Sequence, residues 1–480
     1  MSERTPLLHS GLDDAEVPIN EEAIISNEIS ENITPSKVDH SPLPKLQMTV
    51  LCLVRAIEPI AFFGIFPFVN KMIKETGNMK EADVGFYSGL IESMFSVTQM
   101  ILMISWGNLA DHIGRKPVMV ISLLGIGLGT ALFGLSQTIW QMVLFRCLAG
   151  VFAGTALSVR AMISEISTPR TQARAFSFFA FSGNMGMFLG PLIGGALQDP
   201  AEQYGRIFKR VRFFNQYPYA LPTFATGMLA LLAALVCGLL LKETLKRKAN
   251  TNEDGSPMEA ELTSFEILKK PGVASVVYIY IHTLLLGLGY SAVAPLFWFT
   301  RPSLGGFGLT PRQISYFMGS IGIAQSIWLL VFFPILHRKY GTGAILRTCY
   351  LIWPLTFIVA PLCNHFLRQG WTTAFWIVAP TAQIIGCGVS MAFTCVQLAL
   401  NDVSPSPEAL GTLNALALTG VSGIRAIGPL AFTSIFAAGA RSQFLNGYLV
   451  WVVLVALSLM GTVAMRWFPE TAEGRPKQED

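Results

Sequence analysis

Charged residues are scarce in this chain of 480 residues. Asp, Glu, Lys and Arg make up 13% of it and hydrophobic residues 52%, whereas an average soluble domain carries about 25% charged residues. The net charge is only +4, which argues against nucleic acid as a partner. These shortages exclude an ordinary soluble domain and predict a helical membrane protein, a class in which Gly and Pro are common within helices.

Cysteine and the usual catalytic motifs are also lacking. The seven Cys stand mostly inside apolar runs, with no Cys-x-x-Cys pair and no Cys/His cluster, so we expect packing thiols without disulfides and no metal site. The chain has no His-Glu-x-x-His, Gly-x-Ser-x-Gly or phosphate-binding loop motif. This argues against an enzyme and against a pump driven by ATP.

Long apolar runs separated by short polar loops fill most of the chain. A membrane-spanning helix needs about 20 apolar residues, and twelve runs reach that length. They lie near 47–69, 84–106, 117–136, 139–161, 174–197, 218–241, 272–299, 313–335, 345–365, 372–398, 409–435 and 444–467. The sequence therefore predicts an all-α integral membrane protein with twelve transmembrane helices.

One long polar interruption, 242–271, divides the spans six and six and predicts a cytosolic linker. The two six-helix bundles would occupy 46–241 and 272–467. Residues 1–45 are polar and lack the apolar core of a signal peptide, so we expect a disordered cytosolic tail, with a second tail at 468–480. Lys and Arg are more numerous on the side that holds these tails, which predicts a cytosolic amino terminus.

A weak internal repeat supports the division into two bundles. The loop after the second apolar run has Gly107, Asp111 and Gly114, and the loop after the eighth has Pro334, Arg338 and Gly341 at the same offsets. Gly190-Pro191 in the fifth run likewise recurs as Gly428-Pro429 in the eleventh. Parallel repeats of six spans build one large class of transporters, with the binding site between them.

Three motifs carry a resemblance to a known family. They are a loop between the second and third runs (GNLADHIGRK), an arginine in the fourth run (FRCLAG) and a glycine-proline stretch in the fifth (GNMGMFLGPLIGG). Over about residues 45–470 the chain resembles the major facilitator superfamily, in its twelve-span drug:proton antiporter type, and within it a fungal branch close to the zinc-induced-facilitator-like transporters. The motif residues are Gly107, Asp111, Gly114, Arg115 and Lys116 in the loop, Arg146 and Gly150, and Gly186, Gly190, Pro191, Gly194 and Gly195.

The resemblance implies a secondary active transporter in which two bundles rock around a central cavity. It implies export of a small organic molecule (a drug, metabolite or chelate) in exchange for protons, with the proton gradient in place of any cofactor. We expect a monomer in the lipid bilayer whose partners are protons and a small-molecule substrate. A proton-linked importer or facilitator is the alternative, although the span-5 motif is typical of exporters. A non-transporting nutrient receptor is a third possibility, disfavoured by the short carboxy-terminal tail.

The second half departs from the family pattern. Arg338 stands at the position equivalent to Asp111, and the double glycine is missing after Pro429. The loop chemistry of the two halves is therefore expected to be asymmetric.

Polar side chains within the spans are the candidate site, because an ionisable group at the membrane centre costs at least ~2.5–3.5 kcal/mol. A rise of about 1.5 Å per residue brings groups from seven spans near one layer, where transporters of this kind bind substrate and coupling ions. We predict a proton-coupling site in a central cavity formed by Arg55, Glu58, Glu92, Arg146, Asn184, His282, Gln325 and Arg425.

Glu58 is the first candidate for carrying the proton. Desolvation and a nearby guanidinium act in opposite directions on such a carboxyl group, and Arg55 lies three residues earlier on the same helix face. Glu58 could exchange partners or protons between the inward-open and outward-open states, or it could form a static ion pair with Arg55. Glu92 is the second candidate and stands in a polar stripe.

Arginine cannot carry the proton, since guanidinium stays charged. Arg146 would instead act on a carboxylate, hold an anion or bond to carbonyls of span 1. Arg425 would face an anionic substrate group or pair with Glu58 or Glu92. A lone histidine such as His282 is usually a core residue.

The basic loop from Gly107 to Lys116 is interpreted as a latch. Gly107 and Gly114 permit close approach and a tight turn, while Asp111 can bond to a helix amino terminus and attract Arg115. By resemblance, these contacts hold the cytosolic gate. The loop also fixes topology.

The glycines of the fifth run could form a sealed or flexible interface that favours export, or serve tight packing alone. Near the start of the chain, the segment ERTPLL resembles an acidic dileucine sorting signal through Glu3, Leu7 and Leu8. It predicts a multi-pass protein of the vacuolar membrane, with the plasma membrane as the alternative.

Overall fold

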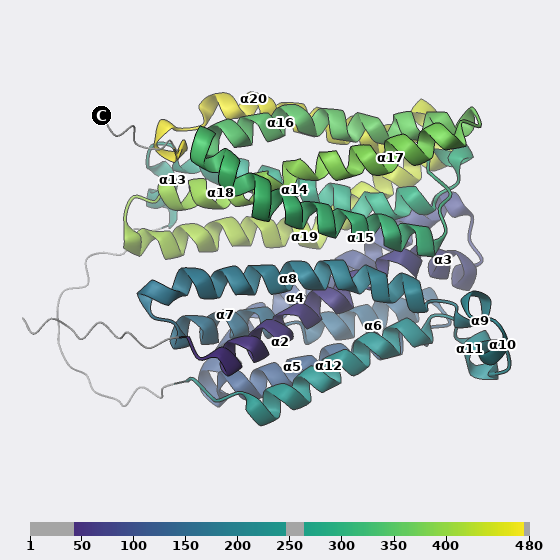
Figure 1. Cartoon of the computed structure of the whole chain (residues 1–480), viewed down its shortest axis with the longest axis horizontal. Helices are drawn as coiled ribbons and strands as arrows, with labels where there is room; N and C mark the ends of the chain where they lie inside the picture. The colour runs from purple at the N-terminus through teal and green to yellow at the C-terminus, as the bar shows by residue number, and fades with distance from the viewer. Residues whose placement is uncertain (1–42, 246–263, 475–480) are drawn as a thin grey trace, which may run out of the picture. The chain divides into compact units, whose positions relative to one another are not determined.

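The computed structural model describes residues 43–245 and 264–474, and within these ranges the chain is helical, with no strand (Figure 1). The first half contains α2 (Lys45–Phe63), α3 (Phe66–Gly77), α4 (Val84–Ile113), α5 (Arg115–Phe133), α6 (Ile139–Val151), α7 (Thr155–Ile166), α8 (Pro169–Leu197), α9 (Pro200–Gln203), α10 (Arg206–Lys209), α11 (Arg212–Gln216) and α12 (Ala220–Leu240). The second half contains α13 (Ser264–Lys269), α14 (Val273–Phe299), α15 (Pro311–Ile327), α16 (Phe333–Arg368), α17 (Thr372–Gly386), α18 (Met391–Asp402), α19 (Pro407–Ser442) and α20 (Leu449–Ala464).

Eleven helical stretches among the described residues are long and apolar enough to cross a membrane. The longest, Pro311–Arg368, has 58 residues, far more than one crossing requires. It breaks at Gly341, whose backbone has φ 78 and ψ 175, so it forms two spans. The predicted twelve-span helical fold is therefore confirmed, and α13 is a short helix inside the segment predicted as a linker.

We number the spans 1 to 12 in chain order. Several spans consist of two helices, because glycine and proline interrupt them. Span 1 is α2 and α3, and span 4 is α6 and α7. Span 8 is α15 with the beginning of α16, while span 10 is α17 and α18. A short π-helix, Trp328–Phe332, lies within span 8, and such segments often mark functional positions. The remaining spans are α4, α5, α8, α12, α14, the rest of α16, α19 and α20.

The two ends of the helices can be told apart by the segments they carry. We call the end where α2 begins, with the turn at Gly114, the proximal end. The end with the loops 78–83, 198–219 and 300–310 is the distal end. Figure 1 shows α13 at the proximal end and the short helices α9 to α11 at the distal end.

The first six spans and the last six meet through α4 against α19 and α8 against α15. The buried residues of α4 run from Val84 to Gln99, with Ala110 the one exception beyond them. Residues 100–109 of the same helix are half-buried or exposed. Two ion pairs join the bundles at the distal end, between Arg301 and Glu81 at 3.3 Å and between Arg441 and Asp83 at 3.7 Å. The bundles are therefore closed on each other distally and less packed proximally.

The turn at Gly341 gives a first prediction. Gly341→Ala is expected to lower the stability of the protein in detergent, because its positive φ disfavours alanine by about 1–3 kcal/mol and a Cβ there would lie 2.8 Å from the Glu473 carbonyl oxygen. Gly370→Ala is the matched control, since Gly370 has φ 75 but no atom within 4 Å of its Cβ position. Thermal unfolding should show a larger loss for Gly341→Ala. Equal losses of stability in the two variants would mean that the strain of the positive φ explains the effect and that the contact with Glu473 does not contribute.

Candidate functional site

Glu58 is buried on α2 at the point where spans 1, 2 and 4 meet, with 7% of its surface exposed. Gln99 Nε2 on α4 donates to Glu58 Oε1 at 2.6 Å, and Thr155 Oγ1 at the start of α7 donates to Oε2 at 2.6 Å. Gln99 Nε2 also donates to the carbonyl of Ala153 at 2.9 Å. Both carboxyl oxygens therefore accept a hydrogen bond from a neutral side chain, at the break between α6 and α7.

The static ion pair between Arg55 and Glu58, one of the two alternatives expected for Glu58, is not formed in this conformation. Within the described part of the chain, Glu58 forms no ion pair within 4.0 Å, although Arg55 lies within electrostatic range of it. The Arg55 guanidinium instead lies over the Phe179 ring of α8, 4.6 Å from its centroid. It also packs on Gly183, where a Cβ would come 2.9 Å from Arg55 Nη2. Aromatic stacking and the missing Gly183 side chain hold Arg55 away from Glu58.

Glu92 and Arg146 form a second group in the first bundle. Both are buried, with 8% and 2% of their surfaces exposed. Glu92 lies within electrostatic range of Arg146 and Arg425, so the structure brings span 11 into the same layer as spans 2 and 4. The Arg146 guanidinium lies between aromatic rings, 5.0 Å from Phe62 and 4.7 Å from Phe95. Its Nη2 donates to the Phe62 carbonyl at 3.5 Å, which matches the predicted bond to span 1.

The structure adds Arg160, which the sequence analysis missed. This residue is exposed although it lies inside span 4, and its guanidinium lies 5.2 Å from the centroid of the same Phe179 ring that Arg55 contacts. Arg160 is within electrostatic range of Glu58 and of Tyr280 on span 7. Span 4 was predicted to end at 161, which placed Arg160 at the membrane surface. Helix α7 continues to Ile166 and places it deeper.

His282 does not belong to this group, which corrects its predicted place in the central cavity. Its Nδ1 lies 3.2 Å from the Tyr350 hydroxyl of span 9, and its ring lies against Gly461 in span 12, where a Cβ would come 2.6 Å from His282 Cε1. Tyr280, two residues earlier on α14, bonds to Gln397 of span 10 at 3.2 Å. Two residues correspond to about 200° of helix rotation, so His282 is on the opposite face, inside the second bundle.

Asn184 and Gln325 lie where α8 and α15 separate. Phe188 and Leu192 of α8 pack on Gly322 and Gly319 of α15. Asn184 lies one turn before Phe188 on α8, further from the distal end, and is exposed. Gln325 is half-buried. The structure shows no hydrogen bond joining either side chain to Glu58 or to the arginines among the described residues. Their place in the central cavity with its proton-coupling site stays a prediction.

The contact between α4 and α19 closes the distal side of this layer. Ser93 Oγ accepts a hydrogen bond from the Leu430 backbone N–H at 3.1 Å, one residue after Pro429, where proline interrupts the hydrogen bonding of α19. Gly85 and Gly89 permit the close approach, since a Cβ on either would lie within 3.0 Å of α19 atoms. Glu92 lies one residue before Ser93, level with this contact, and Arg425 lies just proximal to it on α19.

The span-5 motif packs mainly within the first bundle. Cβ atoms on Gly186, Gly190 and Gly194 would collide with the backbone of span 1 between Ala56 and Gly64. Gly195 is different, because it packs on Ser315 of α15 in the second bundle. The motif therefore serves tight packing at three glycines and the distal contact between bundles at the fourth, and Pro191 lies between them.

The loop from Gly107 to Lys116 is anchored by a residue that the motif does not contain. Asp111 pairs with Arg115 at 2.7 Å as expected, but the amino terminus of α5 is capped by Glu243, which follows span 6. The carboxylate of Glu243 accepts from the backbone N–H of Arg115 and of Lys116, each at 3.0 Å. The cap predicted for Asp111 is therefore wrong, because Gly114 turns the chain toward Glu243.

The second bundle contains a related contact. Glu473, which follows span 12, binds the Arg347 guanidinium near the start of span 9, with one bond at 3.1 Å. Its backbone oxygen accepts from the Gly343 N–H at 3.1 Å. Each bundle thus ties its middle turn, at Gly114 or Gly341, to the segment after its last span.

A second prediction follows from Glu243. Burial acts to raise its pKa, but hydrogen bonds from the backbone N–H groups of Leu245, Lys116, Arg115 and Thr244 outweigh it and hold the pKa below its usual range. The ionised cap therefore stabilises the fold at neutral pH, and this contribution is lost as the pH falls through that lowered pKa.

Glu243→Ala should cost about 1 kcal/mol at pH 7.5, a value typical of helix caps, because the carboxylate is exposed and screened by water. Its apparent melting temperature in detergent should fall below that of the wild type at pH 7.5. The difference should close only as the pH falls below about 4, the usual range of a glutamate carboxyl, and through the lowered pKa of the wild-type Glu243. Glu470→Ala is the control, because Glu470 is an exposed acid that follows span 12 at the proximal end of the second bundle. A deficit that persists at low pH would contradict the charged cap.

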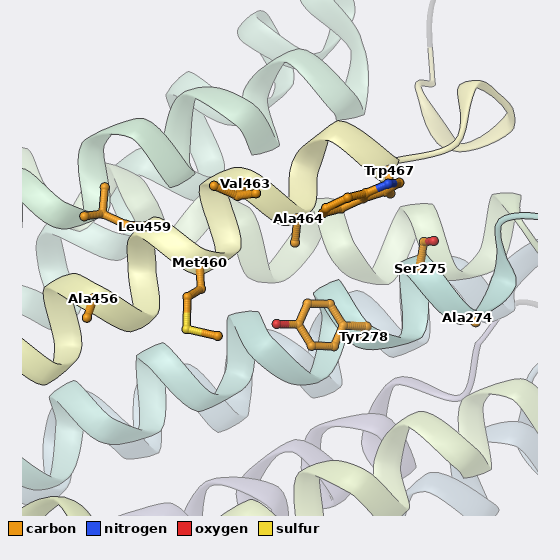
Figure 2. Close-up of a pocket in the computed structure, with 9 residues that line it drawn as sticks. All are labelled: Ala274, Ser275, Tyr278, Ala456, Leu459, Met460, Val463, Ala464 and Trp467. Carbon is orange, nitrogen blue, oxygen red and sulfur yellow. The ribbon is translucent and has the colours of Figure 1, made fainter.

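A groove of about 830 Å³ lies apart from this layer, between α14 and α20 (Figure 2). Tyr278, Met460 and Trp467 line it together with small and aliphatic side chains. It contains none of the candidate site residues. Among the described residues, no group of three or more His, Cys, Asp and Glu side chains is placed to hold a metal ion. Glu3, Leu7 and Leu8 of the predicted sorting signal lie outside the described residues.

Comparisons with known proteins agree with this architecture. The sequence profile described as Major Facilitator Superfamily matches residues 51–429. The chain is 49% identical to "Efflux pump azaK" of Aspergillus niger over 434 residues, which cover 90% of each protein. It is 25% identical to "Major facilitator superfamily multidrug transporter mfsB" of Aspergillus fumigatus, over 93% of this chain and 87% of that protein.

A plant protein and a solved structure are also similar. "Protein ZINC INDUCED FACILITATOR 1" of Arabidopsis thaliana is 24% identical over 89% of this chain and 92% of that protein. The crystal structure of a bacterial homolog to the human lysosomal transporter Spinster, inward-facing and occupied, has a TM-score of 0.65 and 16% identity, and covers 90% of this chain and 98% of that one. At that identity the likeness concerns the fold alone.

Proposed function

The chain belongs to the major facilitator superfamily, and on that premise we propose that it exports a small organic molecule from the cytosol in exchange for protons. Its resemblance to this superfamily, read from the sequence, is confirmed, and the protein is a multi-pass membrane transporter and not an enzyme. Similarity to an efflux pump and to a multidrug transporter supports export of a small molecule.

The observation that carries the proton-coupling proposal is the environment of Glu58. An ionised carboxylate satisfies the two donors, Gln99 and Thr155, that contact it. A proton on Oε2 changes this arrangement, because the Thr155 hydroxyl then has to turn and accept. Thr155 begins α7 immediately after the break in span 4, so proton binding at Glu58 acts on the point where that span can bend.

Charge supports the same conclusion. Arg55 and Arg160 lie within electrostatic range of Glu58 but do not pair with it in this proximally open arrangement. An ionised Glu58 attracts both guanidiniums, and a protonated one does not. Glu58 can therefore favour different arrangements of spans 1 and 4 in its two protonation states. Glu92, beside Arg146 and Arg425, is the second proton site in this proposal.

Alternating access would move the site between the two sides of the membrane. In this proposal the proximal end lies in the cytosol, as the distribution of basic residues favours, and the conformation with its distal side closed is the inward-facing one. The membrane is that of the vacuole if Glu3, Leu7 and Leu8 act as a sorting signal, and otherwise the plasma membrane. In both cases the substrate leaves the cytosol.

A proton-linked importer or facilitator is the second candidate. The observation in its favour is that Arg55 and Arg160, which lie near Glu58, have no paired carboxylate among the described residues. A negatively charged substrate would bind there more readily when Glu58 is protonated, and joint binding of substrate and proton is the coupling of a symporter. The direction of proton movement distinguishes the two candidates.

The test uses the purified protein in liposomes with a trapped pH-sensitive dye. With a proton gradient imposed, a panel of amphipathic drugs, metabolites and chelators is added. Proton movement opposite to the substrate supports exchange. Proton movement with the substrate supports the importer, and substrate movement without protons supports a facilitator and would contradict the coupling role of Glu58.

A further inference from the structure

We propose that Arg55, Arg160 and Arg425 form a binding site for an anionic group, a carboxylate or a phosphate, on the transported molecule. This inference rests on the proposed function, since it takes the layer around Glu58 to be the transport site. It identifies the substrate class as amphipathic organic anions.

The three arginines come from three helices and converge on one region. Arg55 on α2 is within electrostatic range of both Arg160 on α7 and Arg425 on α19. Arg55 and Arg160 also share the ring of Phe179, at 4.6 and 5.2 Å from its centroid. Like charges do not gather in the interior of a membrane protein without a compensating partner. Their convergence therefore points to a negative charge that is supplied from outside the chain.

These guanidiniums stack on an aromatic ring or stand alone, and in the described part of the chain they have no polar partner. None of the three has a hydrogen bond or ion pair within the residues described, and the Nε of Arg55 is buried without an acceptor. The contrast is with Arg347 at the proximal surface, whose guanidinium is fully engaged by Glu473. Guanidinium presents a planar fork of donors that matches carboxylate and phosphate. An incoming anion would satisfy donors that the protein leaves open.

Access and position fit a substrate site. Arg160 is exposed and Arg425 is half-buried. Arg425 lies four residues before Pro429, just proximal to the contact that Ser93 makes with Leu430. The cluster therefore lies where the bundles begin to separate. Tyr280 of span 7 lies within electrostatic range of Arg160 from the second bundle, so both bundles contribute to the region.

The carboxylates nearby do not neutralise the cluster. Both carboxyl oxygens of Glu58 already accept hydrogen bonds, from Gln99 and Thr155. Glu92 is near Arg146 as well as Arg425. With Arg146 included, four guanidiniums face two carboxylates in the layer. A cationic substrate would meet net repulsion, and an anion with an aromatic or aliphatic body would meet both the guanidiniums and the Phe179 ring.

Binding can be measured without any gradient, using the full chain in neutral detergent at pH 7.5. Four probes share one ring system and differ in charge: 2-naphthoate, 2-naphthyl phosphate, 2-naphthamide and 2-naphthylmethylamine. We expect the two anions to bind at least about tenfold more tightly than the amide, and the amine to bind more weakly than the amide. Arg160→Gln and Arg425→Gln should each weaken anion binding by about 10- to 100-fold, the range for hydrogen bonds to charged groups, and leave amide binding unchanged.

Arg312→Gln is the matched control, because Arg312 lies at the distal end of α15 and bonds to Tyr316. Arg425→Lys keeps the charge and should retain more anion binding than Arg425→Gln. Equal binding of naphthoate and naphthamide, or anion binding that survives both glutamine variants, would overturn the inference. So would binding of dioctanoyl phosphatidic acid but not of the small anions, which would assign the cluster to lipid headgroups. Proton flux is not measured here, so failure of the exchange proposal and failure of anion recognition give separate results.

Discussion

Glu58→Gln is expected to reduce substrate-driven proton movement to the level of protein-free liposomes while leaving the protein folded. The amide has the shape of the acid, and it can accept from Gln99 through its oxygen and donate to Thr155 through its nitrogen, replacing the two hydrogen bonds at Glu58. It therefore imitates the protonated carboxyl and cannot release a proton. The dye assay in liposomes measures the loss directly.

Substrate exchange without a gradient provides the second half of that experiment. A carrier fixed in its protonated form can still bind and exchange substrate across the membrane, so labelled substrate should exchange at a rate near that of the wild type. Glu243→Gln, which removes a charge at the proximal surface, should leave proton coupling in place. If Glu58→Gln keeps full proton movement and Glu92→Gln loses it, the proton site is Glu92, and Glu58 only positions span 4.

The sequence predicts well those structural features that depend on residues close together in the chain, and predicts poorly those that depend on distant residues. The twelve spans are visible because each is a continuous apolar run, and Gly341 already marked the turn that divides the 58-residue stretch. Span ends are less visible, because helices continue past the apolar run into polar residues. That continuation explains why Arg160 was missed, since α7 extends five residues beyond the predicted end at 161.

Contacts between distant segments could not be predicted. The ion pair expected from the spacing of Arg55 and Glu58 yields to partners on spans 2 and 4, and the cap assigned to Asp111 belongs to Glu243, 128 residues from Arg115. His282 shows a further limit. Span 7 is apolar on nearly all faces, so its sequence does not reveal which side points to the other bundle. The contact of His282 with Tyr350 of span 9 places His282 inside its own bundle, and the proximity of Tyr280 to Arg160 of span 4 places Tyr280 on the side toward the first bundle.

The glycines of α4 lead to the second prediction with a large effect. Gly89→Ala is expected to open the distal contact between the bundles. The new Cβ would overlap Thr433 Oγ1 and lie 2.8 Å from both Leu430 Cα and the Pro429 oxygen. Thr433 cannot easily turn away, because its hydroxyl donates to the Pro429 carbonyl at 2.7 Å, and the other two atoms belong to the backbone. Helix α19 must therefore move as a whole.

The direction of the effect identifies its cause. Alanine favours a helix over glycine by about 1 kcal/mol, so a loss at this position has to come from the collision, which costs about 1–3 kcal/mol for an overpacked contact. A shift of 1.4 kcal/mol changes a conformational equilibrium about tenfold.

Spin labels at Gln137 and Gln369, in distal loops of the first and second bundles, should show longer and broader distances in Gly89→Ala. Gly423→Ala adds the same methyl group to α19 where nothing lies within 4 Å, and it should leave the distances unchanged. If Gly89→Ala also leaves them unchanged and transports at the wild-type rate, then the packing of α4 on α19 does not hold the distal side closed. In that case the ion pairs of Glu81 and Asp83 with the second bundle must hold it.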